Sequence, residues 1–188
     1  MLAQNSPPSS IDRLSLEDNF RRGQWEGMAG VVTLFSPVGP TKHRPVLNYA
    51  MGNVQAGYML TDVSGNDFWR GNFELAPEAF GARIFHGPGN YIAGGTLWLR
   101  YNFVPPRWRV LPYVQGGAGF VVTDVDHRYD GQDFNFNLDL AGGIRCFIAP
   151  RWALNLEYRY QHISNANLGS KNLGINAHGP ALEMSWFF

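Results

Sequence analysis

The chain has 188 residues, a formal net charge of zero and 45% hydrophobic residues, which fits one domain. Balanced charge gives no electrostatic reason to expect nucleic-acid binding. No stretch reaches the roughly 18–20 consecutive apolar residues that a transmembrane helix needs. The single cysteine, Cys146, excludes an intrachain disulfide and a metal cluster built from cysteines.

Residues 1–23 are expected to form an N-terminal tail. Residues 4–10 are polar and rich in proline, and residues 10–22 have the pattern of a short helix that Ser10 or Asp12 caps. The first residues lack the basic and apolar segments of a secretory signal. We expect that such a signal was removed from this chain or was not included in it.

From residue 24 onward, apolar and polar residues alternate with a period of two. The clearest segment is 151–164, where even positions from Trp152 to Tyr160 are apolar or aromatic. The opposite face carries the polar residues Arg151, Asn155, Glu157, Arg159 and Gln161. A strand separates these two sets onto opposite faces, whereas a helix would scatter them. The same pattern predicts eight strands, at 24–35, 46–61, 68–75, 91–103, 107–123, 133–149, 151–164 and 174–188.

Alternation alone fits either a soluble lipocalin-like or sandwich domain with an apolar core or a membrane barrel with a polar lumen. The polar faces carry both signs of charge, which suits ion pairing in a narrow lumen. These charged residues are Glu26, Glu74, Asp139, Glu157, Glu183, Arg70, Arg100, Arg145 and Arg159. Aromatic residues gather near one set of turns, as in an interfacial girdle. They are Trp69, Tyr101, Phe103, Trp108, Trp152 and Trp186.

The lengths of the connections also favour a membrane barrel. Short turns alternate with longer segments near 36–45, 76–90, 124–132 and 165–173. The final strand ends in Phe188, which resembles the assembly signal of bacterial outer-membrane barrels. We therefore predict an all-β fold, an eight-stranded antiparallel transmembrane β-barrel over 24–188 with short periplasmic turns and longer outer loops. Residues 1–23 then form the tail with its short periplasmic helix, and side chains fill the lumen.

A candidate catalytic pair lies at the end of the seventh strand. His162 and Ser164 share the face that continues Trp152 to Tyr160, so both look toward lipid at the outer edge of the apolar band. By the same parity, Asn176 on the last strand is a neighbour of His162. A serine becomes a nucleophile when a base takes its proton and a third group orients that base. Backbone N–H groups of 165–169, with the Asn172 side chain, are candidates to stabilise the oxyanion.

The run from His162 to Ala166, followed by Asn172, Gly174 and Asn176, resembles the C-terminal motif of the lipid A 3-O-deacylase family. This resemblance implies a lipid-facing site on an eight-stranded outer-membrane barrel. It also implies that Ser164 is the nucleophile, that His162 is the base, and that Asn165 and Asn172 are supporting residues. The best-known members carry Glu where this sequence has Asn176. The aspartates of the adjacent loop could substitute for it: Asp124, Asp126, Asp130 and Asp133.

The predicted function is a serine esterase in the bacterial outer membrane that acts without a cofactor. The resemblance implies that its substrate is an ester-linked 3-O acyl chain of lipid A in lipopolysaccharide. Cations of the outer loops are candidate contacts for the lipid A phosphates: Lys42, Arg44, Arg83, Arg128 and Lys171. The scattered histidines predict no metal site. Two alternatives remain: an inactive barrel that acts as a structural or lipid-binding subunit, and a small adhesion barrel. A homodimer or a larger outer-membrane assembly also stays open. Glycines inside the strands are expected to permit curvature.

Overall fold

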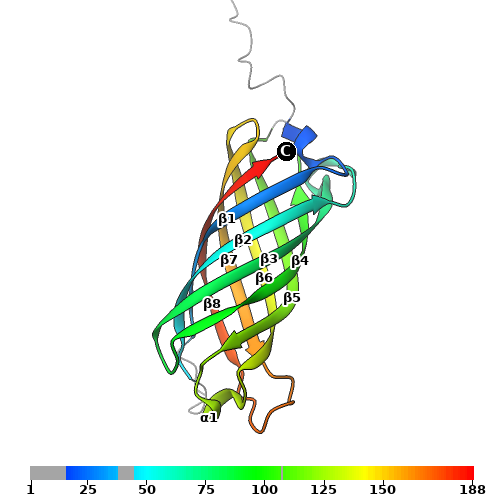
Figure 1. Ribbon diagram of the computed structural model, residues 1–188. Coiled ribbons are helices and arrows are strands. Elements are labelled where there is room, and N and C mark those ends of the chain that lie inside the picture. Colours follow the sequence, from blue (N-terminus) through cyan, green and yellow to red (C-terminus); the bar gives the residue numbers. More distant parts are fainter. Residues whose placement is uncertain (1–15, 38–44, 107) are drawn as a thin grey trace, which may run out of the picture.

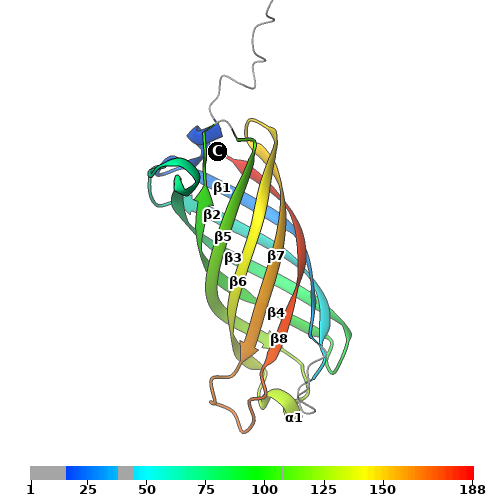
Figure 2. The ribbon, with the colours of Figure 1, turned by 180° about the vertical axis from the view of Figure 1, so that it is seen from behind.

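A computed structural model describes residues 16–37, 45–106 and 108–188, and the side chain of residue 130 lies outside the description. Figures 1 and 2 show a closed barrel in which each strand pairs antiparallel with its sequence neighbours and β1 pairs with β8. The strands are β1 (Trp25–Phe35), β2 (Asn48–Met59), β3 (Gly71–His86), β4 (Tyr91–Phe103), β5 (Val110–Thr123), β6 (Phe134–Ala149), β7 (Trp152–Ser164) and β8 (Ile175–Phe187). The predicted fold class is confirmed.

Among the residues that the structure describes, three short helical segments accompany the strands. The 3-10 helix η2 (Leu16–Phe20) lies at the barrel end that also holds the C-terminus, and it falls inside the segment predicted as a short helix. The 3-10 helix η3 (Asp67–Trp69) lies between β2 and β3, and α1 (His127–Asp130) lies at the opposite end. Among the described residues, no helix has the length and apolar character to cross a membrane.

One predicted strand boundary was wrong. β3 runs over Gly71–His86, where the sequence suggested a strand at 68–75 and a long loop at 76–90. Pro77 caused the error, because proline has no N–H for a β ladder. In the structure, Pro77 pairs with Leu97 of β4, and the pairing with β2 merely skips two positions before resuming in the same register. The outer connection after β3 is therefore short.

The charged side chains predicted for the lumen do lie inside the barrel, with one exception. Arg145 donates to both carboxylate oxygens of Glu26 at 2.7 and 2.8 Å, and Arg159 donates to Glu78 at 2.9 and 3.0 Å. Such pairing offsets the cost of removing these charges from water. Arg70 is the exception, because it lies in the turn before β3 and binds Glu17 of η2 at 2.7 Å. Glu78 joins the lumen set because β3 is longer than predicted.

Apolar side chains close both ends of the lumen, which the prediction of a polar interior did not anticipate. At the outer-loop end a buried cluster includes Leu34, Tyr49 and Ile163. At the other end, Phe20 of η2 is fully buried and packs against Phe187, with ring centroids 5.5 Å apart. The polar network therefore occupies the middle of a filled lumen.

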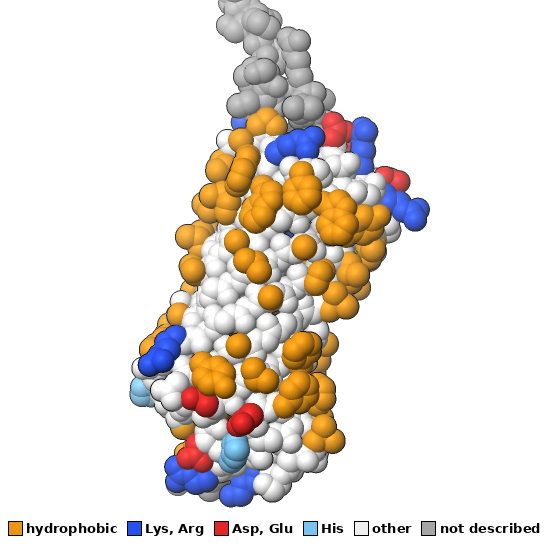
Figure 3. All heavy atoms as spheres, in the orientation of Figure 1, with side chains coloured by type: hydrophobic (Ala, Val, Ile, Leu, Met, Phe, Trp, Pro, Cys, Tyr) orange, Lys and Arg blue, Asp and Glu red, His pale blue; other side chains and the backbone are white. Residues whose placement is uncertain are grey.

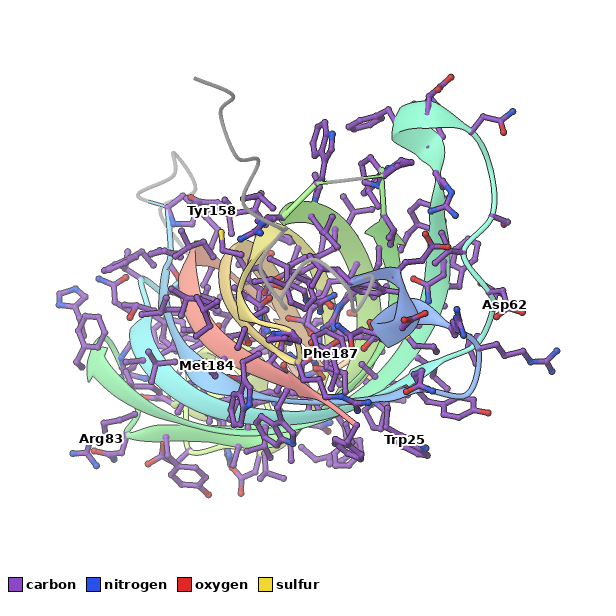
Figure 4. All side chains as sticks on the ribbon, turned by 90° about the horizontal axis from the view of Figure 1, so that it is seen from above. Trp25, Asp62, Arg83, Tyr158, Met184 and Phe187 are labelled. Atoms are coloured by element: carbon purple, nitrogen blue, oxygen red, sulfur yellow. The ribbon has the colours of Figure 1, made fainter. Side chains whose placement is uncertain are left out.

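The outer wall is apolar over most of its height. Figure 3 shows charged side chains gathered at the two ends of the barrel, with hydrophobic side chains over the wall between them. Figure 4 looks along the barrel, with Phe187 over the lumen and Trp25 and Arg83 pointing away from it. Leu140 and Leu156 are about half to two-thirds exposed on this wall. A wall of this kind suits lipid rather than water as its surroundings.

Candidate active site

β7 directs His162 and Ser164 to the outside of the barrel, as predicted. Gln161 and Ile163 are fully buried in the lumen, whereas His162 and Ser164 are half-buried on the opposite face. His162 pairs in register with Asn176 of β8. The period of two along β7 therefore places the imidazole, the hydroxyl and the amide on one external surface, next to the loop at residues 165–174.

The imidazole of His162 has a defined partner. Its Nδ1 lies 2.6 Å from Oδ1 of Asn176. The hydroxyl of Tyr160 donates to the same Oδ1 at 3.0 Å. An amide oxygen only accepts hydrogen bonds, so Nδ1 carries the proton and Nε2 keeps its lone pair. This is the tautomer that a general base needs toward a serine hydroxyl.

The Nε2 side of the imidazole faces a glycine. Gly174 has a left-handed φ of 67°, and a Cβ added to it would lie 3.2 Å from Cε1 and 3.9 Å from Nε2 of His162. A larger residue would be strained there and would crowd this edge of the ring. Within the described residues, the Ser164 hydroxyl makes no hydrogen bond to His162. Catalytic hydrogen bonds of this kind are often long before substrate binds.

Asparagines hold the loop that follows Ser164. The buried Asn165 donates from Nδ2 to the carbonyl of Lys171 at 2.6 Å and accepts from the Asn167 N–H at 2.9 Å. Asn172 accepts from the Asn165 N–H at 3.3 Å and donates to the side chain of Asn167 at 3.0 Å. Both predicted supporting residues thus shape the loop with their amides, and their role toward an oxyanion stays a prediction.

The backbone of the same loop offers a different donor. Ala166 and Asn167 adopt left-handed φ values of 52° and 63°. The N–H groups of Asn167 and Leu168 are occupied by Asn165. In the part of the chain that the structure describes, the N–H of Ala166 has no such partner. It lies two residues after Ser164, which makes it the candidate oxyanion donor.

The aspartates proposed as substitutes for the third member have other partners. Burial raises the pKa of Asp124, but hydrogen bonds from Asn90 and Tyr91 outweigh it and hold that pKa below its usual value. The Arg128 side chain lowers the pKa of Asp126 through a hydrogen bond. Asp133 lies 2.6 Å from Nε2 of His127. The side chain of Asp130 is outside the described residues, so Asn176 is the observed partner of His162.

The candidate phosphate contacts lie at different distances from the site. Lys171 belongs to the loop after Ser164, and the loop of Arg128 packs on it through a hydrogen bond from the Leu173 N–H to the Tyr129 carbonyl at 3.0 Å. Arg128 is already paired with Asp126. Arg83 lies on β3, four strands from β7 in either direction around the barrel, so the structure does not bring it to the site. Lys42 and Arg44 lie outside the described residues.

An external groove begins beside the site. It has a volume of about 580 Å³ and crosses the wall from Tyr160 on β7 to Phe73 on β3. Apart from Gln115 its lining is apolar or aromatic, and it includes Gly116 and Gly142. Four interstrand steps of about 4.8 Å give it a span of about 19 Å. Tyr160 lies near the outer-loop end of β7 and Phe73 near the opposite end of β3, so the groove descends along the barrel.

Sequence analysis did not predict the hydrogen bond between Tyr160 and Asn176 or the groove that Gly116 and Gly142 line. Gly116 and Gly142 were expected to permit curvature, but a Cβ at Gly142 would meet no atom closer than 3.8 Å, and one at Gly116 none closer than 3.4 Å. The backbone therefore does not demand glycine at these two positions. Both glycines occupy outward-facing positions, and the adjoining strands carry large side chains beside them. This pattern in the sequence could have predicted a groove. Among the described residues, no group of three or more acidic, His or Cys side chains could hold a metal ion.

Comparison of the fold with solved structures defines the class of protein. The outer membrane enzyme PagL matches with a TM-score of 0.59 and 14% identity, over 84% of this chain and 97% of that one. Neisserial surface protein A (NspA) matches with a TM-score of 0.60 and 16% identity, over 87% and 97%. The N-terminal β-barrel domain of Pseudomonas aeruginosa OprF matches with 0.56 and 14%, over 89% and 100%. The fold is that of the eight-stranded outer-membrane barrels.

The family within this class follows from the sequence. The model of the family described as lipid A 3-O-deacylase (PagL) matches residues 48–185, which extend from β2 into β8. The chain therefore belongs to the lipid A 3-O-deacylase family. No curated protein matches the sequence significantly.

Proposed function

We propose that this protein is an esterase of the bacterial outer membrane that removes the ester-linked 3-O acyl chain from lipid A. The observation that carries the proposal is the 2.6 Å contact between Nδ1 of His162 and Oδ1 of Asn176, on the outer wall and two residues from Ser164. Membership of the deacylase family supplies the ester substrate.

The position of the pair along the barrel suits an ester in the outer leaflet. Ten residues separate Trp152, near the turn end of β7, from His162, which corresponds to about 33 Å along a strand and about 25 Å of height at a tilt of about 40°. This equals the usual height of the apolar band of such barrels. His162 and Ser164 then lie where acyl chains join their head groups, within reach of lipopolysaccharide, and the groove below Tyr160 takes the acyl chain of the substrate.

The chain's own residues account for each step of the hydrolysis. Nε2 of His162 takes the proton of Ser164 as Oγ attacks the ester carbonyl, and the Ala166 N–H stabilises the oxyanion. The C–O bond to the sugar breaks, the sugar 3-oxygen receives the proton from His162, and the acyl group stays on Ser164. Water, deprotonated by His162, then attacks the carbonyl carbon of this acyl-enzyme. The bond from that carbon to Oγ of Ser164 breaks, His162 returns the proton to Oγ, and the fatty acid leaves. No cofactor is required for these steps.

Two observations favour a second candidate function. Asn176 stabilises a developing imidazolium less than a carboxylate does, and Ser164 is not hydrogen-bonded to His162 among the described residues. Both features fit a barrel that kept the site's geometry and binds lipid without cleaving it.

A single assay separates the two functions. The purified barrel is incubated with lipopolysaccharide in detergent, and lipid A is analysed by mass spectrometry. The esterase predicts loss of one hydroxyacyl chain with the unaltered chain and no loss with Ser164→Ala. Unchanged lipid A, with a barrel that circular dichroism shows to be folded, would instead support the lipid-binding subunit.

A further inference from the structure

The hydroxyl of Tyr160 meets the only oxygen of the Asn176 side chain. Tyr160 and Asn176 are diagonal neighbours on β7 and β8, since Tyr160 itself pairs with His178 and His162 pairs with Asn176. Oδ1 of Asn176 therefore receives two hydrogen bonds, one from the phenol at 3.0 Å and one from the imidazole at 2.6 Å. The next tyrosine along the strand, Tyr158, binds Nδ1 of His178 instead.

An amide differs from a carboxylate in having two unlike ends. If the amide of Asn176 turned by 180°, its NH₂ group would face Nδ1 of His162, and the imidazole proton would move to Nε2. Nε2 would then be a donor and could not take the proton of Ser164. The orientation of this one amide thus decides whether His162 is a base. A carboxylate at the same place has two equivalent oxygens and meets no such choice.

We propose that Tyr160 is a positioning residue that selects the productive orientation of Asn176 and so allows an amide to replace the carboxylate of the catalytic site; this rests on the proposed esterase function. In the observed orientation the phenol proton has an acceptor in Oδ1. In the turned orientation the phenol oxygen could accept from the NH₂ group, but the phenol would lose Oδ1, which is the acceptor that the described residues give it. The turned state therefore lacks the hydrogen bond that the phenol donates in the observed state, and the phenol favours the observed orientation.

The first test reads the tautomer and does not depend on activity. The barrel with ¹⁵N-labelled histidine is refolded in detergent micelles, and the imidazole nitrogens of His162 are observed by NMR at a pH where the ring is neutral. We expect Nδ1–H in the unaltered chain and a mixture, or Nε2–H, in Tyr160→Phe. This substitution keeps the ring and hence the packing of the groove. An unchanged Nδ1–H tautomer in Tyr160→Phe would overturn the proposal.

The second test is a double-mutant comparison of the deacylation rate. Tyr160→Phe should lower the rate up to about tenfold, the equivalent of one lost hydrogen bond, and should change it little when Asn176→Asp is already present. Tyr91→Phe, which removes another wall-facing phenol on β4, is the matched control. Equal losses in both backgrounds would refute the orientation role. If the unaltered chain has no activity, the proposed function fails, and the tautomer result still decides the role of Tyr160.

Discussion

Replacing Asn176 by aspartate tests the third member of the proposed catalytic site with almost no change of shape. The side chain keeps its length, and a carboxylate oxygen takes the place of Oδ1, 2.6 Å from Nδ1 of His162. When His162 accepts the proton of Ser164 it becomes positively charged. Its hydrogen bond to the carboxylate at position 176 then joins two groups of opposite charge. The benefit therefore arises in the transition state rather than in the resting enzyme.

The magnitude follows from the two kinds of hydrogen bond. A neutral bond contributes about 0.5–1.5 kcal/mol and a bond to a charged group about 1.5–3 kcal/mol. The difference of about 1–1.5 kcal/mol corresponds to an acceleration of about tenfold. Because the interaction strengthens only in the transition state, kcat and kcat/KM should rise together.

The assay follows hydroxyacyl release from lipopolysaccharide by mass spectrometry over time. Asn48→Asp, which adds the same charge at the outer-loop end of β2, is the control and should leave the rate unchanged. Asn176→Leu removes the acceptor and should slow the reaction well below the unaltered rate. Equal rates for the asparagine, aspartate and leucine forms would refute the assignment of position 176.

Three further outcomes are expected. Gly142→Val should fold normally, because a Cβ there meets no atom closer than 3.8 Å. The variant should nevertheless release long acyl chains about 100-fold more slowly, since misplacement of the substrate by about 1 Å can cost that much. Gly81→Val on the far wall is the control and should keep full activity, and an equal loss in both variants would argue against the groove. Phe20→Ala should lower the free energy of unfolding in detergent by about 3–5 kcal/mol, because the ring is fully buried; an unchanged unfolding curve would show that η2 does not seal the barrel. The hydrogen bond from Arg70 lowers the pKa of Glu17 in the folded protein. The pair therefore stabilises the fold above the unfolded pKa of Glu17, and this stabilisation is lost as the pH falls through the lower, folded pKa. Glu17→Gln should reduce the free energy of unfolding by less than about 1 kcal/mol at neutral pH and not at all in acid, and a reduction that persisted at low pH would contradict the pairing.

Much of the barrel was predictable because one physical constraint governs every strand. A wall with lipid on one side and a narrow lumen on the other forces a period of two, and β7 follows it from Trp152 to Ser164 without exception. The exposed face of His162 follows from the same parity. The prediction from this pattern was wrong near Pro77. Proline has no N–H to donate and therefore suggests the end of a strand, but here it interrupts only part of the pairing between β2 and β3.

Features that depend on contacts between strands were not predictable in the same way. The sequence places Tyr160 on the outer wall. Its hydrogen bond to Asn176, however, depends on the orientation of the phenol toward a residue of β8 that is its diagonal neighbour rather than its register partner. Gly116 pairs with Leu140 and Gly142 with Val114, so the groove that these glycines line depends on the register between β5 and β6. The apolar plug at each lumen end likewise depends on contacts between elements. η2 packs into one end, and inward side chains of several strands, with Leu47 and Val125 of the connections, fill the other.

The central claim, that His162 activates Ser164 on the lipid-facing wall, can be tested by covalent labelling of the folded barrel. A serine-directed fluorophosphonate with an alkyl chain is added in detergent, and the labelled residue is located by peptide mass spectrometry. The label should appear on Ser164 and fall to background in His162→Ala. Absence of label on Ser164 in the unaltered barrel, or equal labelling without the imidazole, would contradict the account.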